Sequence, residues 1–128
     1  DGADYVYTRA AAAVVASDVV SILVDGTVTP LTTVNASVGS AIGFAQTAIA
    51  NGSFGWVALR GPNLQVNVLA ACAPEVMLFT TATAGFLDDA TVTLGLVVGV
   101  MTQAAATSNA TAHTAICAYP HISRHLMA

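Results

Sequence analysis

The chain has 128 residues, of which 55% are hydrophobic and only 8% are charged, and its formal net charge is −4 at pH 7. This length accommodates one domain, and ordinary soluble domains carry about 25% charged residues. Lysine is absent, so the only permanently cationic side chains are those of three arginines. A nucleic-acid-binding surface needs a basic stripe, so we expect no nucleic acid among the partners. A surface with so few charges indicates that other subunits cover much of it, which predicts a homo-oligomer.

The apolar excess does not predict a membrane span. The longest apolar stretch, residues 10–24, is shorter than the roughly 20 residues that cross a bilayer, and Ser17 and Asp18 interrupt it. A charge at the centre of a span is costly in lipid. The first residues, DGADYVYTRA, also lack the basic segment of a signal peptide. We therefore expect no membrane contact.

The first nine residues read as an extended segment in which Tyr5 and Tyr7 alternate with other residues. We predict an N-terminal arm over residues 1–9 and a single β domain over residues 10–128. An arm with aromatic side chains two positions apart suits addition to the sheet of a neighbouring subunit. Docking of the arm on its own domain is the alternative, and the sequence favours neither.

The remaining chain consists of short stretches rich in Val, Thr and Ile that are separated by Gly, Asn, Asp and Pro. Residues 21–31 predict a hairpin with Asp25 and Gly26 at its turn. Residues 43–72 predict three strands with reversals at 51–52 and 61–63. Residues 77–89 predict a strand, and residues 91–103 predict a strand that is buried on both faces. Residues 112–120 predict a last strand that Pro120 ends.

Helix is expected to be scarce, since only residues 10–16 and 45–50 have helical propensity and both segments are short. No internal repeat or linker divides the chain. The predicted fold class is mainly β: a small antiparallel β-barrel or β-sandwich with an extended N-terminal arm and little helix.

The only tryptophan lies in the stretch FGWVALR, residues 54–60. Since side chains alternate along a strand, Phe54, Trp56 and Arg60 share one face. We predict that Trp56 lies in the core and that this face emerges near Arg60 into a contact with another subunit. Together with the aromatic arm, this gives a predicted interface with other protein subunits that consists of Tyr5, Tyr7, Arg9, Phe54, Trp56 and Arg60.

No catalytic constellation is visible in the sequence. The GxSxG motif of serine hydrolases is absent. Asp88 and Asp89 are adjacent, so on a strand they are expected to point to opposite sides and to lie in a solvated turn rather than form an acid–base pair. We therefore predict that the protein is not an enzyme and has no cofactor.

A metal site is not expected either. His113, Cys117, His121 and His125 recur every four residues, a spacing that would suit one ion on a helix. On a strand the same spacing separates neighbouring side chains by about 13 Å, which is too far for one ion. Cys117 and Cys72 are expected to be buried free thiols, with a single disulfide as the alternative.

Several longer stretches share a pattern with a known group of proteins. They are IGFAQTAIANGSFGWVALRGP, LFTTATAGFLDD, VVGVMTQAA and AICAYP, which together span residues 42–120. The glycines and Trp56 in this pattern resemble those of small virion proteins of tailed bacteriophages. Within that group the chain is most similar to the capsid decoration, or cement, proteins. The first forty residues match no such pattern.

The resemblance implies a small β-barrel or β-sandwich that binds as a trimer at local three-fold sites of an expanded icosahedral capsid. It implies the major capsid protein as partner, a location on the outer capsid surface of the virion after assembly in the host cytoplasm, and no catalytic residues. One alternative is another virion component, such as a tail, neck or head-fibre subunit. Another is an extracellular ligand-binding β module, which the glycosylation sequons at Asn35, Asn51 and Asn109 would suit.

Overall fold

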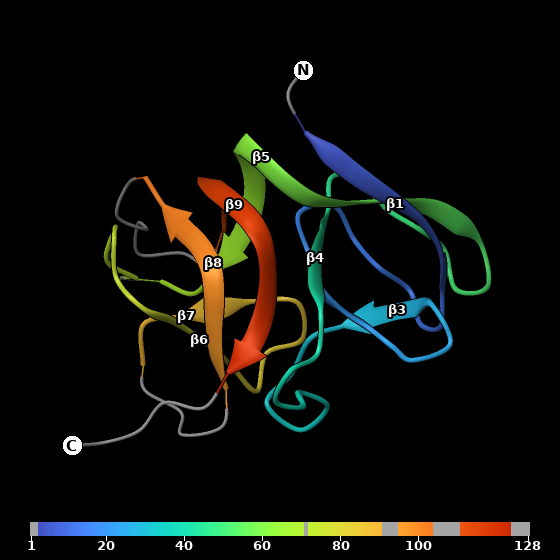
Figure 1. The fold of residues 1–128 in the computed structure, drawn as a ribbon, viewed down its shortest axis with the longest axis horizontal. Coiled ribbons are helices and arrows are strands. Elements are labelled where there is room, and N and C mark those ends of the chain that lie inside the picture. Colours follow the sequence, from blue (N-terminus) through green and yellow to red (C-terminus); the bar gives the residue numbers. More distant parts are fainter. Residues whose placement is uncertain (1–2, 71, 91–94, 104–110, 124–128) are drawn as a thin grey trace.

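The computed structural model describes residues 3–70, 72–90, 95–103 and 111–123. These residues form one mixed nine-stranded sheet (Figure 1). None of the described residues is helical, so among them there is no helix that could cross a membrane. The mainly β fold class is therefore confirmed. The strands are β1 (Asp4–Ala10), β2 (Val19–Ile22), β3 (Thr27–Pro30), β4 (Ile42–Ala45), β5 (Phe54–Val68), β6 (Leu78–Thr80), β7 (Leu87–Asp88), β8 (Leu96–Thr102) and β9 (Thr111–Ser123).

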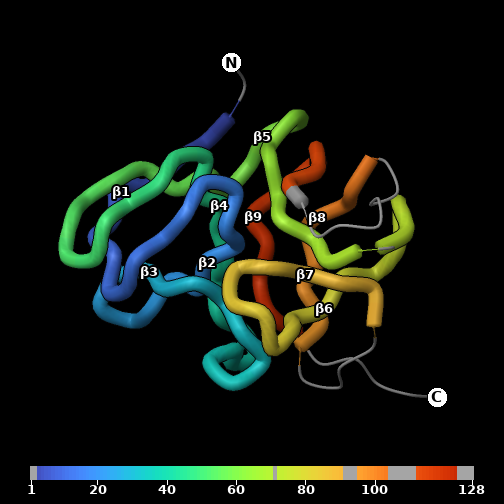
Figure 2. The backbone as a smooth tube through the Cα atoms, turned by 180° about the vertical axis from the view of Figure 1, so that it is seen from behind, coloured from blue at the N-terminus to red at the C-terminus, as the bar shows by residue number. Residues whose placement is uncertain are grey.

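The long strand β5 belongs to two cycles of paired strands. In the first cycle β1, β3, β2, β4 and β5 pair in that order, and β5 pairs again with β1. In the second cycle β5, β7, β6, β8 and β9 pair in that order, and β9 returns to β5. Figure 1 shows β5 extending from the first group of strands to the second, and Figure 2 shows the same division from behind. The molecule is thus built of two barrel-like halves that share one strand.

Most of the strand pairs are antiparallel, as the sequence predicts. The parallel pairs are β1–β3 and β5–β7, and each rests on a short register. The two segments with helical propensity, residues 10–16 and 45–50, are instead joined by an isolated antiparallel bridge between Val14 and Ile49. Ala10 and Ala45 are fully buried, whereas most of the other alanines in these two segments are exposed.

Two hydrophobic clusters fill the molecule, and the central strands contribute to both. Neighbouring residues divide between the clusters: Val19 and Val20 in β2 face different clusters, and so do Phe44 and Ala45 in β4. Because successive side chains point to opposite faces of a strand, β2 and β4 have no face left for charged residues. This accounts in part for the small number of charges in the sequence. The first cluster consists of Ala10, Val14, Val20, Val28, Ala45, Ile49 and Val57.

The predicted turns at Asp25–Gly26 and at Asn51–Gly52 are confirmed. Gly26 and Gly52 have φ angles of 85° and 82°, in the left-handed region that glycine adopts readily. The Asp25 carboxylate accepts hydrogen bonds from the backbone N–H of Thr27 at 3.0 Å and from its hydroxyl at 2.7 Å. These local contacts fix the β2–β3 hairpin.

The predicted reversal at 61–63 and the predicted end of the last strand at Pro120 are both wrong. β5 continues through Pro62, with a shift in its register to β9 between Gly61 and Leu64, and β9 continues through Pro120 to Ser123. A proline removes one N–H from a ladder, which a β-bulge tolerates. β5 pairs with β1 up to Arg60 and already pairs with β9 at Arg60 and Gly61, so the irregularity at Pro62 lies just after the residue that both partner strands share.

Two other strand predictions are partly right. Residues 77–89 form two short strands, β6 and β7, that pair with each other around a turn at Gly85, rather than one strand. Of the predicted strand 91–103, residues 96–102 form β8 and residues 91–94 lie outside the described part. Only Val97 and Thr102 of β8 are buried, so β8 is not buried on both faces as predicted. Apolar runs predict burial only when both faces of the strand meet other elements, and β8 lies over one cluster alone.

The N-terminal segment is extended, and it lies on its own domain. β1 pairs with β5 from Asp4↔Arg60 to Arg9↔Phe54, and its last residues pair with β3. Of the two alternatives for residues 1–9, the structure therefore shows docking on the same chain for residues 4–9; residues 1–2 lie outside the described part.

Candidate interaction surface

Three aromatic side chains lie together on the outer face of the β1–β5 ladder. Tyr7, Phe54 and Trp56 are 56%, 60% and 57% exposed, and we call them the aromatic patch. Tyr7 is the register partner of Trp56, and Phe54 lies two residues before Trp56 on β5. Alternation along the strands therefore brings the three rings to one side. The ring centroids of Tyr7 and Phe54 are 5.7 Å apart with nearly parallel planes, and those of Tyr7 and Trp56 are 4.9 Å apart with tilted planes.

The prediction that Trp56 lies in the core is wrong. Sequence alternation correctly places Phe54 and Trp56 on a shared face, but that face is the outer one. The neighbouring Val57 is fully buried and joins the first cluster, which consists of alanine, valine and isoleucine. A cluster of such small aliphatic residues has no space for an indole. Hydrophobicity alone does not indicate which side of this strand faces inward, because both of its faces carry apolar residues.

The predicted interface residues are all located on β1 and the first half of β5. Tyr5 is 39% exposed and lies two residues before Tyr7 on β1, opposite Ala58. Arg9 is exposed, and its Nε donates a hydrogen bond of 3.4 Å to the carbonyl oxygen of Gly52. The structure thus brings together residues that are about fifty positions apart in the sequence.

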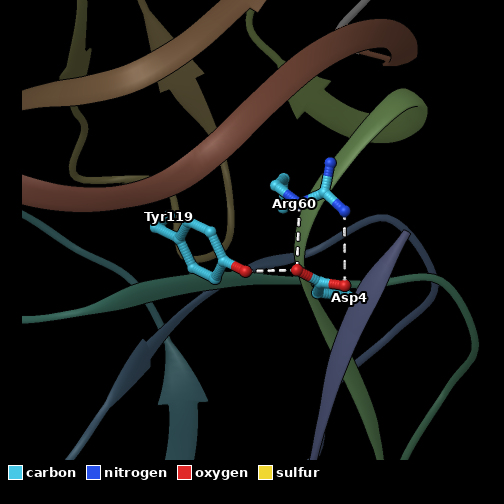
Figure 3. A network of polar contacts seen from close by, with 3 residues as sticks. All are labelled: Asp4, Arg60 and Tyr119. Carbon is cyan, nitrogen blue, oxygen red and sulfur yellow. Dashed lines mark hydrogen bonds and ion pairs between the residues drawn. The ribbon is translucent and has the colours of Figure 1, made fainter. Parts of the chain in front are cut away.

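Arg60 belongs to a polar network that joins β1, β5 and β9 (Figure 3). Its Nε donates to Asp4 Oδ2 at 2.9 Å and its Nη2 donates to Asp4 Oδ1 at 3.4 Å. The hydroxyl of Tyr119 donates to Asp4 Oδ2 as well. These hydrogen bonds from Arg60 and Tyr119 lower the pKa of the Asp4 carboxyl from its ordinary value. The network ties the N-terminal strand to the second half of the molecule.

Sequence reasoning missed Asp4 and Tyr119 as parts of this site. Tyr119 precedes Pro120 and has a φ of 47°, so it leaves the regular alternation of β9. Its side chain is 55% exposed. No local pattern predicts that position, since it depends on the pairing of β9 with strands from distant parts of the chain.

One group among the described residues could hold a metal ion. Ligand atoms of Cys72, Asp88 and Asp89 all lie within 4.8 Å of one another, so the prediction that the two carboxylates point to opposite sides is wrong. The reason is that β7 ends at Asp88 and Asp89 lies in the following bend. The backbone N–H of Ala73 already donates to Asp89 Oδ2 at 3.1 Å. Burial is the larger cause and the nearby carboxylates the smaller one that raise the pKa of the Cys72 thiol to about 11. The thiol is therefore protonated at neutral pH.

The histidine series does not lie on a helix. His113, Cys117 and His121 are all part of β9, whereas His125 lies outside the described residues. Cys117 is buried and free, and so is Cys72, as the sequence predicts. Burial raises the pKa of Cys117 to about 12.

The comparisons with known proteins give no relative on which a role could be based. No protein-family model matches the chain, and no curated protein or solved structure is significantly similar to it.

Proposed function

We propose that the chain is a virion structural protein that decorates and stabilises an icosahedral phage capsid, without catalytic activity or a cofactor. Its partner is the major capsid protein, and its working form is a trimer bound between capsomers at local three-fold sites. The observation that carries this proposal is the aromatic patch, three exposed rings on the outside of a small β scaffold. The resemblance of residues 42–120 to decoration proteins is the reason for proposing the capsid as the partner.

The size of the aromatic patch suits attachment in many copies. An aromatic side chain buries about 150–250 Å² when fully covered, so three rings that are more than half exposed offer about 300 Å² to a partner. At about 25 cal/mol per Å² this area contributes about 8 kcal/mol before the costs of association. Those costs are about 4–15 kcal/mol, so one patch alone binds weakly. Several patches on one oligomer would bind a repetitive capsid lattice far more tightly.

The scaffold keeps this surface in place. The rings contact one another, and the β1–β5 ladder beneath them is tied to β9 through Asp4, Arg60 and Tyr119. Side chains that are already ordered lose little conformational entropy when they bind. Decoration would then stabilise the capsid, because a protein that binds the assembled shell and not its free subunits shifts the equilibrium towards the shell.

The test is co-sedimentation of the purified protein with expanded capsids of the phage that encodes it. We expect saturable binding, a rise in the temperature at which the capsids disrupt, and at least a roughly tenfold loss of binding in a Phe54→Ala/Trp56→Ala double variant. The matched control is Val24→Ala, which removes a fully exposed apolar side chain from the β2–β3 turn.

The proposal fails if the protein does not bind capsids, or if the double variant folds and binds as tightly as the control. Recovery with tails or necks instead of capsids would favour another virion role. Binding of the free protein to a glycan, weakened by the same double variant, would favour a ligand-binding module.

A further inference from the structure

One edge of β1 lacks a partner strand over most of its length. Residues 4–8 pair with β5 on one side, and β3 reaches only Arg9 and Ala10 on the other side. Among the described residues, no strand pairs with the second edge of residues 4–8. The backbone N–H and C=O groups along this edge are therefore available to another strand.

Between Tyr5 and Thr8 this edge has none of the features that protect exposed strands from pairing, since the register irregularity of β1 lies before this stretch, between Asp4 and Tyr5. Natural edge strands carry lysine, proline, a bulge or an inward-pointing charge that prevents another strand from adding. Residues 5–8 are Tyr, Val, Tyr and Thr. The only charge in the unpaired stretch is that of Asp4, and Arg60 neutralises it through an ion pair of 2.9 Å. A chain with a net charge of −4 can thus approach a copy of itself at this edge without repulsion between carboxylates.

The sequence of the edge is also complementary to itself. Tyr5, Val6 and Tyr7 read the same in both directions. When two such strands meet antiparallel with Val6 at the centre, Tyr5 lies opposite Tyr7 of the second copy and Val6 lies opposite Val6 of the second copy. Directly opposite residues in an antiparallel pair point to the same face and contact each other. Aromatic rings then meet on the outer face, and valines meet on the inner one.

A cavity on the inner side gives this pairing a further contact. Its volume is about 210 Å³, and Val6, Ile22 and Leu59 are among the mainly apolar residues that line it. Because Val6 of the second copy points to the same side as Val6, the pairing places a second apolar side chain beside this cavity.

We propose that two copies of this chain join through β1, antiparallel, about a two-fold axis at Val6. The β5–β1 ladder then continues into the β1–β5 ladder of the second copy, and the two aromatic patches form one row. The contact is isologous, so two edges satisfy each other and each chain pairs with only one other chain through β1. The inference does not depend on the capsid as partner. Whether the copies are otherwise single or grouped in trimers, this contact makes the number of chains even.

The first test is the mass of the protein in solution, measured by light scattering over a dilution series. We expect an even multiple of 12.9 kDa, and half of that mass for Tyr5→Lys, because a lysine on an edge strand disfavours pairing. Tyr5 is 39% exposed, so the variant can fold, and circular dichroism checks that it does. The control is Val24→Lys in the exposed β2–β3 turn, which should keep the wild-type mass.

The second test is disulfide formation between introduced cysteines, for which the buried native thiols of Cys72 and Cys117 provide a silent background. Val6→Cys should cross-link two chains at least about ten times faster than Val24→Cys, because pairing raises the effective concentration of the two thiols. A mixture of Tyr5→Cys and Tyr7→Cys should give the mixed disulfide faster than either variant gives its own, since only the mixed pair is directly opposite.

A monomer at all concentrations would overturn the proposal. So would a trimer whose mass Tyr5→Lys leaves unchanged, combined with cross-linking at Val6 no faster than at Val24. If Tyr5→Lys weakens capsid binding but changes neither mass nor cross-linking, the edge accepts a strand from another protein and self-pairing is wrong. Failure to bind capsids does not affect these readouts, so the two proposals fail separately.

Discussion

The hydroxyl of Thr8 provides the sharpest test of the packing in the first half of the molecule. Thr8 is 4% exposed, and its Oγ1 is buried without a hydrogen-bond partner among the described residues. A buried hydroxyl that lacks a partner costs about 1–3 kcal/mol, because it has lost its hydrogen bonds to water. Thr8→Val replaces this hydroxyl by a methyl group of similar shape, and valine and threonine are both β-branched. We expect the variant to be more stable by about 1–2 kcal/mol.

The matched control is Thr80→Val in β6. Thr80 is 1% exposed, but its hydroxyl is 3.0 Å from the hydroxyl of Thr33 and hydrogen-bonded to it. The same substitution there removes a hydrogen bond, so we expect a loss of about 1 kcal/mol. The two variants therefore differ in the sign of the effect, although the chemistry and the burial of the changed residue are the same.

The assay is urea denaturation followed by circular dichroism, with the free energy of unfolding obtained by linear extrapolation. An unchanged slope with denaturant concentration would show that the variants alter stability and not the compactness of the unfolded chain. If Thr8→Val destabilises the protein as much as Thr80→Val does, the Thr8 hydroxyl has a partner and the description of its surroundings is wrong.

Three further substitutions test other parts of the fold. Trp56→Ala should lower the free energy of unfolding by only about 1 kcal/mol, whereas Phe44→Ala, in a fully buried position, should cost about 3–5 kcal/mol in the same denaturation assay. Gly85→Ala should cost about 3 kcal/mol, because Gly85 has a φ of 84° and a Cβ there would overlap the Asp18 carboxylate. Gly39→Ala, with a φ of 90° and open space around it, should cost only about 1 kcal/mol and serves as its control. Burial raises the pKa of Asp18 above the ordinary 3.8, so the folded state binds this proton more tightly than the unfolded state. The free energy of unfolding should then rise as the pH falls from neutral through the folded pKa towards 3.8. Asp18→Asn should lack this gain in thermal melts recorded across that pH range. Identical pH profiles for the two proteins would refute this role of Asp18.

The features that the sequence predicts correctly are the local ones. The turn at Asp25–Gly26 depends on a glycine with a positive φ and on hydrogen bonds within two residues, so it can be read without knowledge of the rest of the chain. Pro62 and Pro120 show the opposite case. Whether a proline interrupts a strand depends on whether the pairing with the neighbouring strand tolerates an irregularity, and that pairing, with β9 for Pro62 and with β8 for Pro120, is not visible in the residues around the proline.

The candidate surface was predictable in its membership but not in its orientation. Alternation groups Phe54 with Trp56, and the aromatic pattern of the first residues adds Tyr5 and Tyr7. Which side of β5 faces inward depends on the size of the space within the first cycle of strands, and a cluster built on Val57 leaves no room for the larger ring. The small number of charged residues in the chain also follows from the packing, because strands such as β2 and β4 are buried on both faces.

Because β5 is shared, only one half of the molecule has all its strands in one continuous segment of the chain. Residues 54–123 contain every strand of the second cycle, including β5, whereas residues 3–52 contain four strands of the first cycle and lack the strand that closes it. A chain emerging from the ribosome therefore cannot complete its first half until β5 has been synthesised and can pair with both β4 and β1. Cleavage of the loop before β5 would leave the C-terminal fragment with every strand of the second cycle. The N-terminal fragment would lack the strand that joins β4 to β1. The order of assembly is thus encoded in the position of one strand, which must be present before either half can close.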